Sequence, residues 1–217
     1  MLQMQQRPSC DVRAKKEFGE AAPSDLHVKG VEMTVSPTND RVYSQSIERL
    51  RFPERRDRLE VERVARLCLD GGNISTLLDI GTGSALFAET FFKAGVTVAG
   101  VDTNPEMINA AKGHLPEGEF IVAPAESLPF ADSSFDATFF GVVFHEVSDY
   151  GQAMREAYRV SRRLTCILEW QHKQEEFGPP LEHRLTEEFL RNLGLSTGYR
   201  SFESVALKTL ALYRMHK

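Results

Sequence analysis

Residues Thr76 to Asp102, TLLDIGTGSALFAETFFKAGVTVAGVD, decide the fold. The run 76–80 is short and apolar, as in a strand that is buried on both faces of a parallel sheet. Apolar side chains then recur at helical spacing until Gly95, which is the expected C′ residue of a helix. A second apolar run, 97–101, ends at Asp102. The stretch therefore predicts a strand, a glycine turn, a helix and a second strand.

The turn after the first of these strands predicts a ligand site. Gly81 and Gly83 have no Cβ and allow a backbone to pass close to a ligand. Ligands of doubly wound α/β sheets bind beyond the carboxyl ends of the strands, so Asp79 and Asp102 are expected to face one crevice. A carboxylate after the second strand is the usual partner of a ribose diol. The sequence thus indicates a nucleotide-type cofactor; a glycine turn without a ligand is the alternative.

The residues of the turn distinguish between cofactors. A nicotinamide fingerprint has a third glycine, or an alanine, three residues after its second glycine, and that position is Leu86 here. Asp79, two residues before the first glycine, would repel a pyrophosphate. A carboxylate at this position instead suits a cationic amino-acid tail.

Composition and charge are those of an ordinary globular protein. The 217 residues are 41% hydrophobic with a net charge of −5, which gives no general attraction to nucleic acid or to an anionic membrane. Cys10, Cys68 and Cys166 lie far apart, which favours a reducing compartment without disulfides. No apolar run reaches the ~18 residues of a membrane span, and the N-terminus lacks the apolar core of a signal peptide. We therefore expect a cytoplasmic protein.

The chain is expected to contain one domain. Residues 1–45 are polar and without periodicity, which predicts a flexible extension that either mediates dimerisation or remains disordered. Residues 46–217 are long enough for a single α/β domain. The oligomeric state stays open, with a homodimer among the alternatives.

Further elements follow from periodicity and capping residues. An amphipathic helix is expected over 51–69, and helices are expected to begin after Asn104, Asp149 and Thr186. Strands are expected over 119–123, 135–144 and 163–170, with the last helix ending at Gly194 and two tail strands on either side of Glu203-Ser204.

Two stretches resemble a known family. The turn Asp79-x-Gly81-x-Gly83-x-Ala85 is similar to the first motif of class I S-adenosylmethionine-dependent methyltransferases, in which the last position is usually glycine. Residues 123–140, APAESLPFADSSFDATFF, closely resemble the type-11 methyltransferase domain of the ubiquinone and menaquinone-biosynthesis kind. The resemblance covers about residues 50–170. It implies a Rossmann-like, doubly wound, seven-stranded sheet with helices on both faces and an antiparallel last strand that lies between its neighbours.

The resemblance also implies a cofactor, S-adenosyl-L-methionine, and roles for single residues. Pro124 stands where the family usually has an aspartate that binds the adenine amino group, so adenine recognition is expected to depend on the backbone of Ala125, with Glu126 as a substitute acceptor. Met107 either lines the adenosine or belongs to the core. The cofactor-binding residues implied in this way are Asp79, Gly81, Gly83 and Ala85 for the methionine tail, Asp102 for the ribose, Thr103 and Met107 for the adenosine, Ala125 and Glu126 for the adenine, and Phe144 beside the methyl group.

Catalytic candidates lie after the fourth and fifth strands. His145 either accepts a proton from a hydroxyl or acidic carbon, since an unperturbed imidazole titrates near ~6.5, or it packs against the cofactor. Glu169 is a second candidate base. Trp170 or Phe177 could steady a sulfonium by a cation–π contact.

The acceptor and the competing function classes complete the hypothesis. The loop 171–185 carries aromatic, acidic and imidazole side chains and suits a small-molecule methyl acceptor. His145, His172 and His183 lack metal-ligand spacing. The alternatives are a non-catalytic module that binds the cofactor or a partner, and a nicotinamide oxidoreductase, which lacks both its third glycine and a Tyr-x-x-x-Lys pair.

Overall fold

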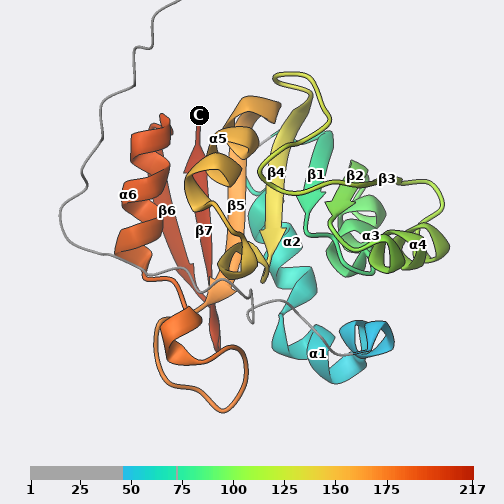
Figure 1. Ribbon diagram of the computed structural model, residues 1–217, viewed down its shortest axis with the longest axis horizontal. Coiled ribbons are helices and arrows are strands. Elements are labelled where there is room, and N and C mark those ends of the chain that lie inside the picture. Colours follow the sequence, from blue (N-terminus) through green and yellow to red (C-terminus); the bar gives the residue numbers. More distant parts are fainter. Residues whose placement is uncertain (1–45, 72) are drawn as a thin grey trace, which may run out of the picture. The chain divides into compact units, whose positions relative to one another are not determined.

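A computed structural model describes residues 46–71 and 73–217 (Figure 1). The extension expected over residues 1–45 lies outside the described residues. In the described part seven strands form one sheet in the order β3-β2-β1-β4-β5-β7-β6. The strands are β1 (Thr76–Ile80), β2 (Thr97–Asp102), β3 (Glu119–Val122), β4 (Phe135–Gly141), β5 (Ser161–Trp170), β6 (Ser201–Ala206) and β7 (Leu210–His216).

Strand directions confirm the predicted doubly wound sheet. β1 pairs in parallel with β2 and with β4, β2 with β3, and β4 with β5. β7 is antiparallel to both β5 and β6 and lies between them. The strand order reverses at β1 and β4, which is where a doubly wound sheet opens a crevice for a ligand.

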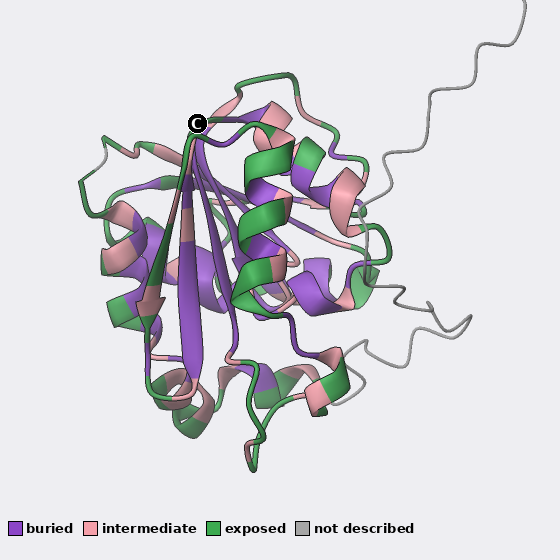
Figure 2. Cartoon of the chain, turned by 90° about the vertical axis from the view of Figure 1, so that its left-hand side faces the viewer, coloured by how far each residue is buried: buried purple, intermediate pink, exposed green. Residues whose placement is uncertain are grey.

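Helices cover both faces of the sheet. Leu77 packs with α2, α3 and α4 on one face, while its neighbour Leu78 packs with α5 and α6 on the other. This alternation follows from the two-residue period of a strand, and both faces are buried (Figure 2). The helices are η1 (Ile47–Arg51), α1 (Pro53–Arg58), α2 (Val61–Leu69), α3 (Leu86–Lys93), α4 (Pro105–His114), η2 (Phe144–Glu146), α5 (Tyr150–Val160), η3 (Leu181–His183) and α6 (Glu187–Thr197).

The predicted helix starts are confirmed. The side chains of Asn104, Asp149 and Thr186 each accept a hydrogen bond from a backbone N–H in the first turn of the helix that follows. Gly95 follows α3 with a φ of +90°, as expected of a C′ residue.

The helix predicted over 51–69 is wrong in one respect, because it is two helices. Glu60 adopts left-handed backbone angles between α1 and α2, with φ at 48°. The change of direction lets Leu59 and Val61 both reach the core, where 2% and 0% of their surfaces are exposed. The Glu60 carboxylate accepts a hydrogen bond from the Lys208 N–H at 2.9 Å, which holds the break against the β6–β7 turn.

Three predicted boundaries are also wrong. β4 ends at Gly141 and not at residue 144, because Val142 turns the chain with a φ of +61°. α6 continues through Gly194 to Thr197; a Cβ at Gly194 would lie 2.7 Å from Met215 Sδ, so the glycine lets helix and sheet approach. The last two strands turn at 207–209, beyond Glu203-Ser204.

None of the helices in the described part of the chain is long and apolar enough to cross a membrane.

Candidate functional site

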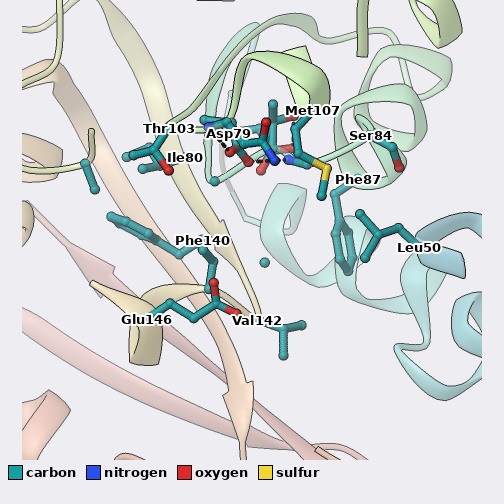
Figure 3. A pocket seen from close by; sticks show the side chains of 18 of the residues that line it. Leu50, Asp79, Ile80, Ser84, Phe87, Thr103, Met107, Phe140, Val142 and Glu146 are labelled. Carbon is teal, nitrogen blue, oxygen red and sulfur yellow. Dashed lines mark hydrogen bonds between the residues drawn. The ribbon is translucent and has the colours of Figure 1, made fainter. Parts of the chain in front are cut away.

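A cavity of about 340 Å³ opens at the carboxyl ends of β1, β2 and β4 (Figure 3). This volume lies in the range of small-molecule sites. The topology brings together residues from the glycine turn, the ends of two neighbouring strands and the segment after β3. The predicted cofactor residues that line it are Asp79, Gly81, Gly83, Asp102, Thr103, Met107, Ala125 and Glu126.

The glycine turn folds over the end of β2. The backbone N–H groups of Gly81 and Thr82 both donate to the Val101 carbonyl, at 2.8 and 2.9 Å. Gly81 has a φ of +72°, and a Cβ on it would lie 2.6 Å from a methyl of Val143. The turn therefore needs glycine here for both conformation and space.

Ala85 ends this turn and does not line the cavity. Its φ of +63° places it in the left-handed region, and it is fully buried at the start of α3. Ser84, one residue earlier, does line the cavity. Its hydroxyl oxygen is buried and has no hydrogen-bond partner among the residues that the structure describes.

Asp79 is the buried carboxylate of the cavity, with 2% of its surface exposed. Thr82 donates its hydroxyl to Asp79 Oδ2 at 2.8 Å. Burial nevertheless raises the pKa of Asp79 to about 7, against the hydrogen bonds from Thr82 and the Ala88 N–H. A cation placed next to this carboxylate would favour its ionised form.

Asp102 is held at the cavity edge by the backbone. Its Oδ2 accepts a hydrogen bond from the Gly83 N–H at 3.0 Å, and its Oδ1 accepts one from the Asn104 N–H at 2.9 Å. Burial raises the pKa of Asp102, although both hydrogen bonds oppose that rise. The glycine turn and the end of β2 are thus joined through this carboxylate.

Glu126 connects two segments of the wall. Its Oε1 accepts hydrogen bonds from the N–H groups of Ser148 at 3.0 Å and Asp149 at 3.2 Å. Pro124, which replaces the family's aspartate, is exposed and does not line the cavity. Its carbonyl accepts a hydrogen bond from the Ser127 N–H at 3.2 Å.

The rest of the family-like stretch supports the fold. Arg159 on α5 donates to the carbonyls of Leu128 at 3.0 Å and Phe130 at 2.7 Å, and pairs with Asp132 at 2.9 Å. These three contacts hold the segment between β3 and β4 against α5. Much of the motif that carries the resemblance is therefore structural, and only Ala123, Ala125, Glu126 and Phe140 of it line the ligand cavity.

His145 and Glu169 form a buried pair and do not line the cavity. His145 Nδ1 lies 2.9 Å from both carboxylate oxygens of Glu169, and the two residues are 4% and 1% exposed. Phe144 is fully buried as well, with its ring against Phe140 and Tyr150. The structure thus brings the two predicted catalytic residues together, but behind the cavity wall.

The cavity wall contains residues that the sequence did not indicate. Glu146 follows His145 on η2 and reaches the cavity from the side opposite Asp79 (Figure 3). Arg55 reaches it from α1. Neither has a motif or a spacing that could have identified it, whereas Thr82 and Ser84 lie within the glycine turn and had such a signal.

The two aromatic side chains expected beside a sulfonium have other partners. The Trp170 ring is buried and lies 5.5 Å from the Arg184 guanidinium. The Arg58 guanidinium lies 3.9 Å from the centre of the Phe177 ring, and thereby joins α1 to the loop after β5. Neither ring lines the cavity. No group of three metal-binding side chains occurs in ranges 46–71 and 73–217.

Comparison with protein families gives one match. Residues 78–164 match the model of a methyltransferase domain. Among curated proteins, a demethylmenaquinone methyltransferase of Thermotoga maritima is 36% identical over 104 residues, which are 47% of this chain and 45% of the relative. The corresponding enzyme of Chlorobaculum tepidum is 34% identical over 110 residues, 50% of this chain and 46% of the relative. The match thus spans about half the length of these curated relatives.

Solved structures share the fold. A SAM-dependent methyltransferase from Aquifex aeolicus superposes with a TM-score of 0.71 at 23% identity, over 78% of this chain and 96% of that one. The [4+2]-cyclase SpnF superposes with a TM-score of 0.63 at 18% identity, over 77% of this chain and 83% of the other. The fold alone therefore does not determine the reaction.

Proposed function

We propose that this chain, whose residues 78–164 match a methyltransferase domain, is a type-11, class I S-adenosylmethionine-dependent methyltransferase that transfers the methyl group of S-adenosylmethionine to a small-molecule acceptor. The observation that carries the proposal is the cavity that Asp79 and Asp102 share at the switch point of the sheet. The domain itself is proposed to occupy residues 46–217.

The residues of the cavity fit this cofactor. Asp79 is a buried carboxylate that a cationic ammonium group would stabilise in its charged form. Asp102 lies at the end of β2, where a ribose diol binds in doubly wound folds. The buried Ser84 hydroxyl supplies a further donor and acceptor, and Gly81 and Gly83 leave room for close backbone contact.

The chemistry divides between cofactor and protein. The cofactor supplies a methyl group that its positive sulfur already activates. The residues of the chain bind and orient the two reactants, which can contribute several kcal/mol, up to ~7–11 in well-aligned cases. They also exclude water, which protects the reaction and strengthens local electrostatics.

For the acceptor we propose a small, partly apolar molecule such as a reduced naphthoquinone. The relatives from Thermotoga maritima and Chlorobaculum tepidum act, by name, on demethylmenaquinone. Phe140, Val142 and Val147 give the β4 side of the cavity an apolar wall. A hydroquinone ring would bury its apolar surface there.

Equilibrium binding tests the proposal before any acceptor is known. Isothermal titration with S-adenosylmethionine, S-adenosylhomocysteine and NAD should give micromolar binding of the first two and none of the third. Asp102→Ala should weaken binding of the first two, whereas Asp70→Ala, which removes an exposed carboxylate at the end of α2, should not. Absence of binding of S-adenosylmethionine and S-adenosylhomocysteine would contradict the proposal and favour the non-catalytic module.

A further inference from the structure

Three side chains connect the cavity wall to the protein interior. Glu146 lines the cavity, and one of its carboxylate oxygens, Oε1, lies 3.8 Å from His145 Nε2. The other ring nitrogen, Nδ1, lies 2.9 Å from the Glu169 carboxylate. We propose that Glu146 is the residue that takes the proton from the acceptor, that His145 receives the proton from Glu146, and that Glu169 positions the His145 ring. The inference rests on the proposed methyl transfer and deepens it.

The hydrogen bonds around Glu169 determine which ring nitrogen can accept a proton. Glu169 Oε1 accepts a hydrogen bond from the backbone N–H of His145 at 3.0 Å, and Oε2 accepts one from the backbone N–H of Trp170 at 3.2 Å. Both oxygens therefore accept hydrogen bonds from the backbone, which favours the ionised carboxylate, and we assign the ring hydrogen to His145 Nδ1 as its donor to Glu169. His145 Nε2, on the side of Glu146, is then the atom that gains and loses a proton.

Hydrogen bonds from the protein hold the other carboxylates of the cavity in place. Asp79 accepts from the Thr82 hydroxyl, Asp102 from the amides of the glycine turn and of Asn104, and Glu126 from the amides that follow η2. Glu146 is the cavity carboxylate that faces a histidine ring, and it lies on the β4 side, away from Asp79 (Figure 3). This is the side on which we place the acceptor.

Charged and polar groups from several elements surround the relay. Tyr150 on α5 donates its hydroxyl to the His145 carbonyl at 3.2 Å and so fixes the turn of η2. Arg55 on α1 lines the same cavity as Glu146. Glu169 approaches from the end of β5.

The proton transfer defines the class of acceptor. The O–H bond of the acceptor breaks, the proton forms an O–H bond on the Glu146 carboxylate, and it passes on to form an N–H bond on His145 Nε2. The electron pair left on the acceptor oxygen forms the new O–C bond to the methyl carbon, and the sulfur keeps the pair of the S–C bond that breaks. A carboxylate base suits an acidic hydroxyl, so the acceptor is a phenol, enol or hydroquinone and not an amine, which reacts through its own lone pair.

Ring titration of His145 tests the relay without cofactor or acceptor. The His145 ring signals are assigned in nitrogen-15 NMR spectra by their loss in His145→Gln. Glu146→Gln and Glu169→Gln should each lower the midpoint of their pH titration by about one unit, because each removes a neighbouring negative charge. Glu119→Gln removes an exposed carboxylate on the edge strand β3 and should leave the midpoint unchanged. An unchanged midpoint in Glu146→Gln overturns the relay.

Turnover tests the role of the relay in transfer, with 1,4-naphthohydroquinone kept reduced by dithionite as the probe. Glu146→Gln should lower kcat about 100-fold or more, and Glu169→Gln about tenfold with little change in KM, while cofactor affinity stays within twofold in both. Loss of cofactor affinity in Glu146→Gln would make this residue a cofactor contact and overturn the inference. Turnover at the wild-type rate in Glu146→Gln would also overturn the inference.

The wild type separates the remaining failures. If it binds S-adenosylmethionine but leaves the probe unmethylated, the acceptor class alone is overturned. If it does not bind the cofactor, the proposed function itself has failed.

Discussion

Asp79 and Asp102 line one cavity from neighbouring parallel strands, and the charge of Asp102 adds to the burial that raises the pKa of Asp79 to about 7. Ionising two carboxylates in one small cavity costs free energy because their negative charges repel each other. A ligand that brings positive charge to Asp79 removes part of that penalty. The strength with which such a ligand binds must therefore depend on pH.

Affinity for S-adenosylmethionine should rise with pH between 5.5 and 7.5. Asp79 becomes mostly ionised over this range, whereas the amino group of the ligand, with an ordinary pKa of about 7.7–8.0, stays mostly protonated. Isothermal titration at several pH values should show roughly tenfold tighter binding at the upper end. Asp79→Asn should bind more weakly at pH 7.5, with a flatter profile; an equally steep profile would assign the titration to another group.

The same carboxylate should make the fold less stable as the pH rises. The unfolded chain releases the Asp79 proton near 3.8 and the folded chain near 7, so the folded state holds more protons between these values. The stability contributed by protonated Asp79 is complete below pH 4 and is lost as the pH rises through 7. Asp79→Asn should therefore be more stable than wild type at pH 8, by on the order of 1–4 kcal/mol.

Urea unfolding at pH 5 and pH 8 measures this difference. Asp57→Asn, which removes an exposed carboxylate on α1, is the matched control and should show no such gain. A gain of equal size at both pH values would show that packing, and not ionisation, explains the effect.

Two Gly→Ala substitutions should act in opposite directions. At Gly81 a methyl would collide with Val143 and occupy a left-handed backbone, so Gly81→Ala should cost on the order of 2–4 kcal/mol and weaken cofactor binding at least tenfold. At Gly113, in α4, no atom lies within 4 Å of the added methyl, and alanine should stabilise the helix by up to about 1 kcal/mol. Thermal unfolding and isothermal titration of both variants check this pair; equal effects would contradict it.

Arg184 should control the order of the loop between β5 and α6. Its buried guanidinium donates to the carbonyls of four loop residues, Gln171, Lys173, Phe177 and Pro179, at 2.7 to 3.3 Å. Lysine cannot reproduce this planar set of donors. Arg184→Lys should therefore make the bond after Phe177, which is half exposed, several-fold more sensitive to chymotrypsin.

A matched arginine provides the control for that digestion. Arg191→Lys changes a surface pair with Glu187 on α6 and should leave cleavage at Phe177 unchanged. Equal sensitivity of both variants would indicate general loosening of the fold and not release of this loop.

The sheet and one half of the cavity could be predicted because local sequence encodes them. Apolar runs mark the buried strands, and Gly81 and Gly83 mark the turn whatever the rest of the chain does. Asp79 and Asp102 follow from their places at strand ends. Each of these signals is contained within a few neighbouring residues.

The other half of the cavity wall, after β4, depends on tertiary packing that no local sequence pattern reveals. After Thr138 the run 139–144 has no polar side chain, so nothing in it shows that the strand stops at Gly141. There a Cβ would meet the rings of Phe139 and Phe87, at 2.8 and 2.9 Å. The turn that follows buries His145 and presents Glu146 to the cavity, although adjacent residues were equally good candidates in the sequence.

The position of β7 determines when the sheet can close relative to synthesis of the chain. β7 lies between β5 and β6, although both of those strands precede it in the chain. While a nascent chain lacks Leu210–His216, β6 has no strand to pair with and the edge of β5 stays open. The sheet can therefore close only after Leu210–His216 has left the ribosome.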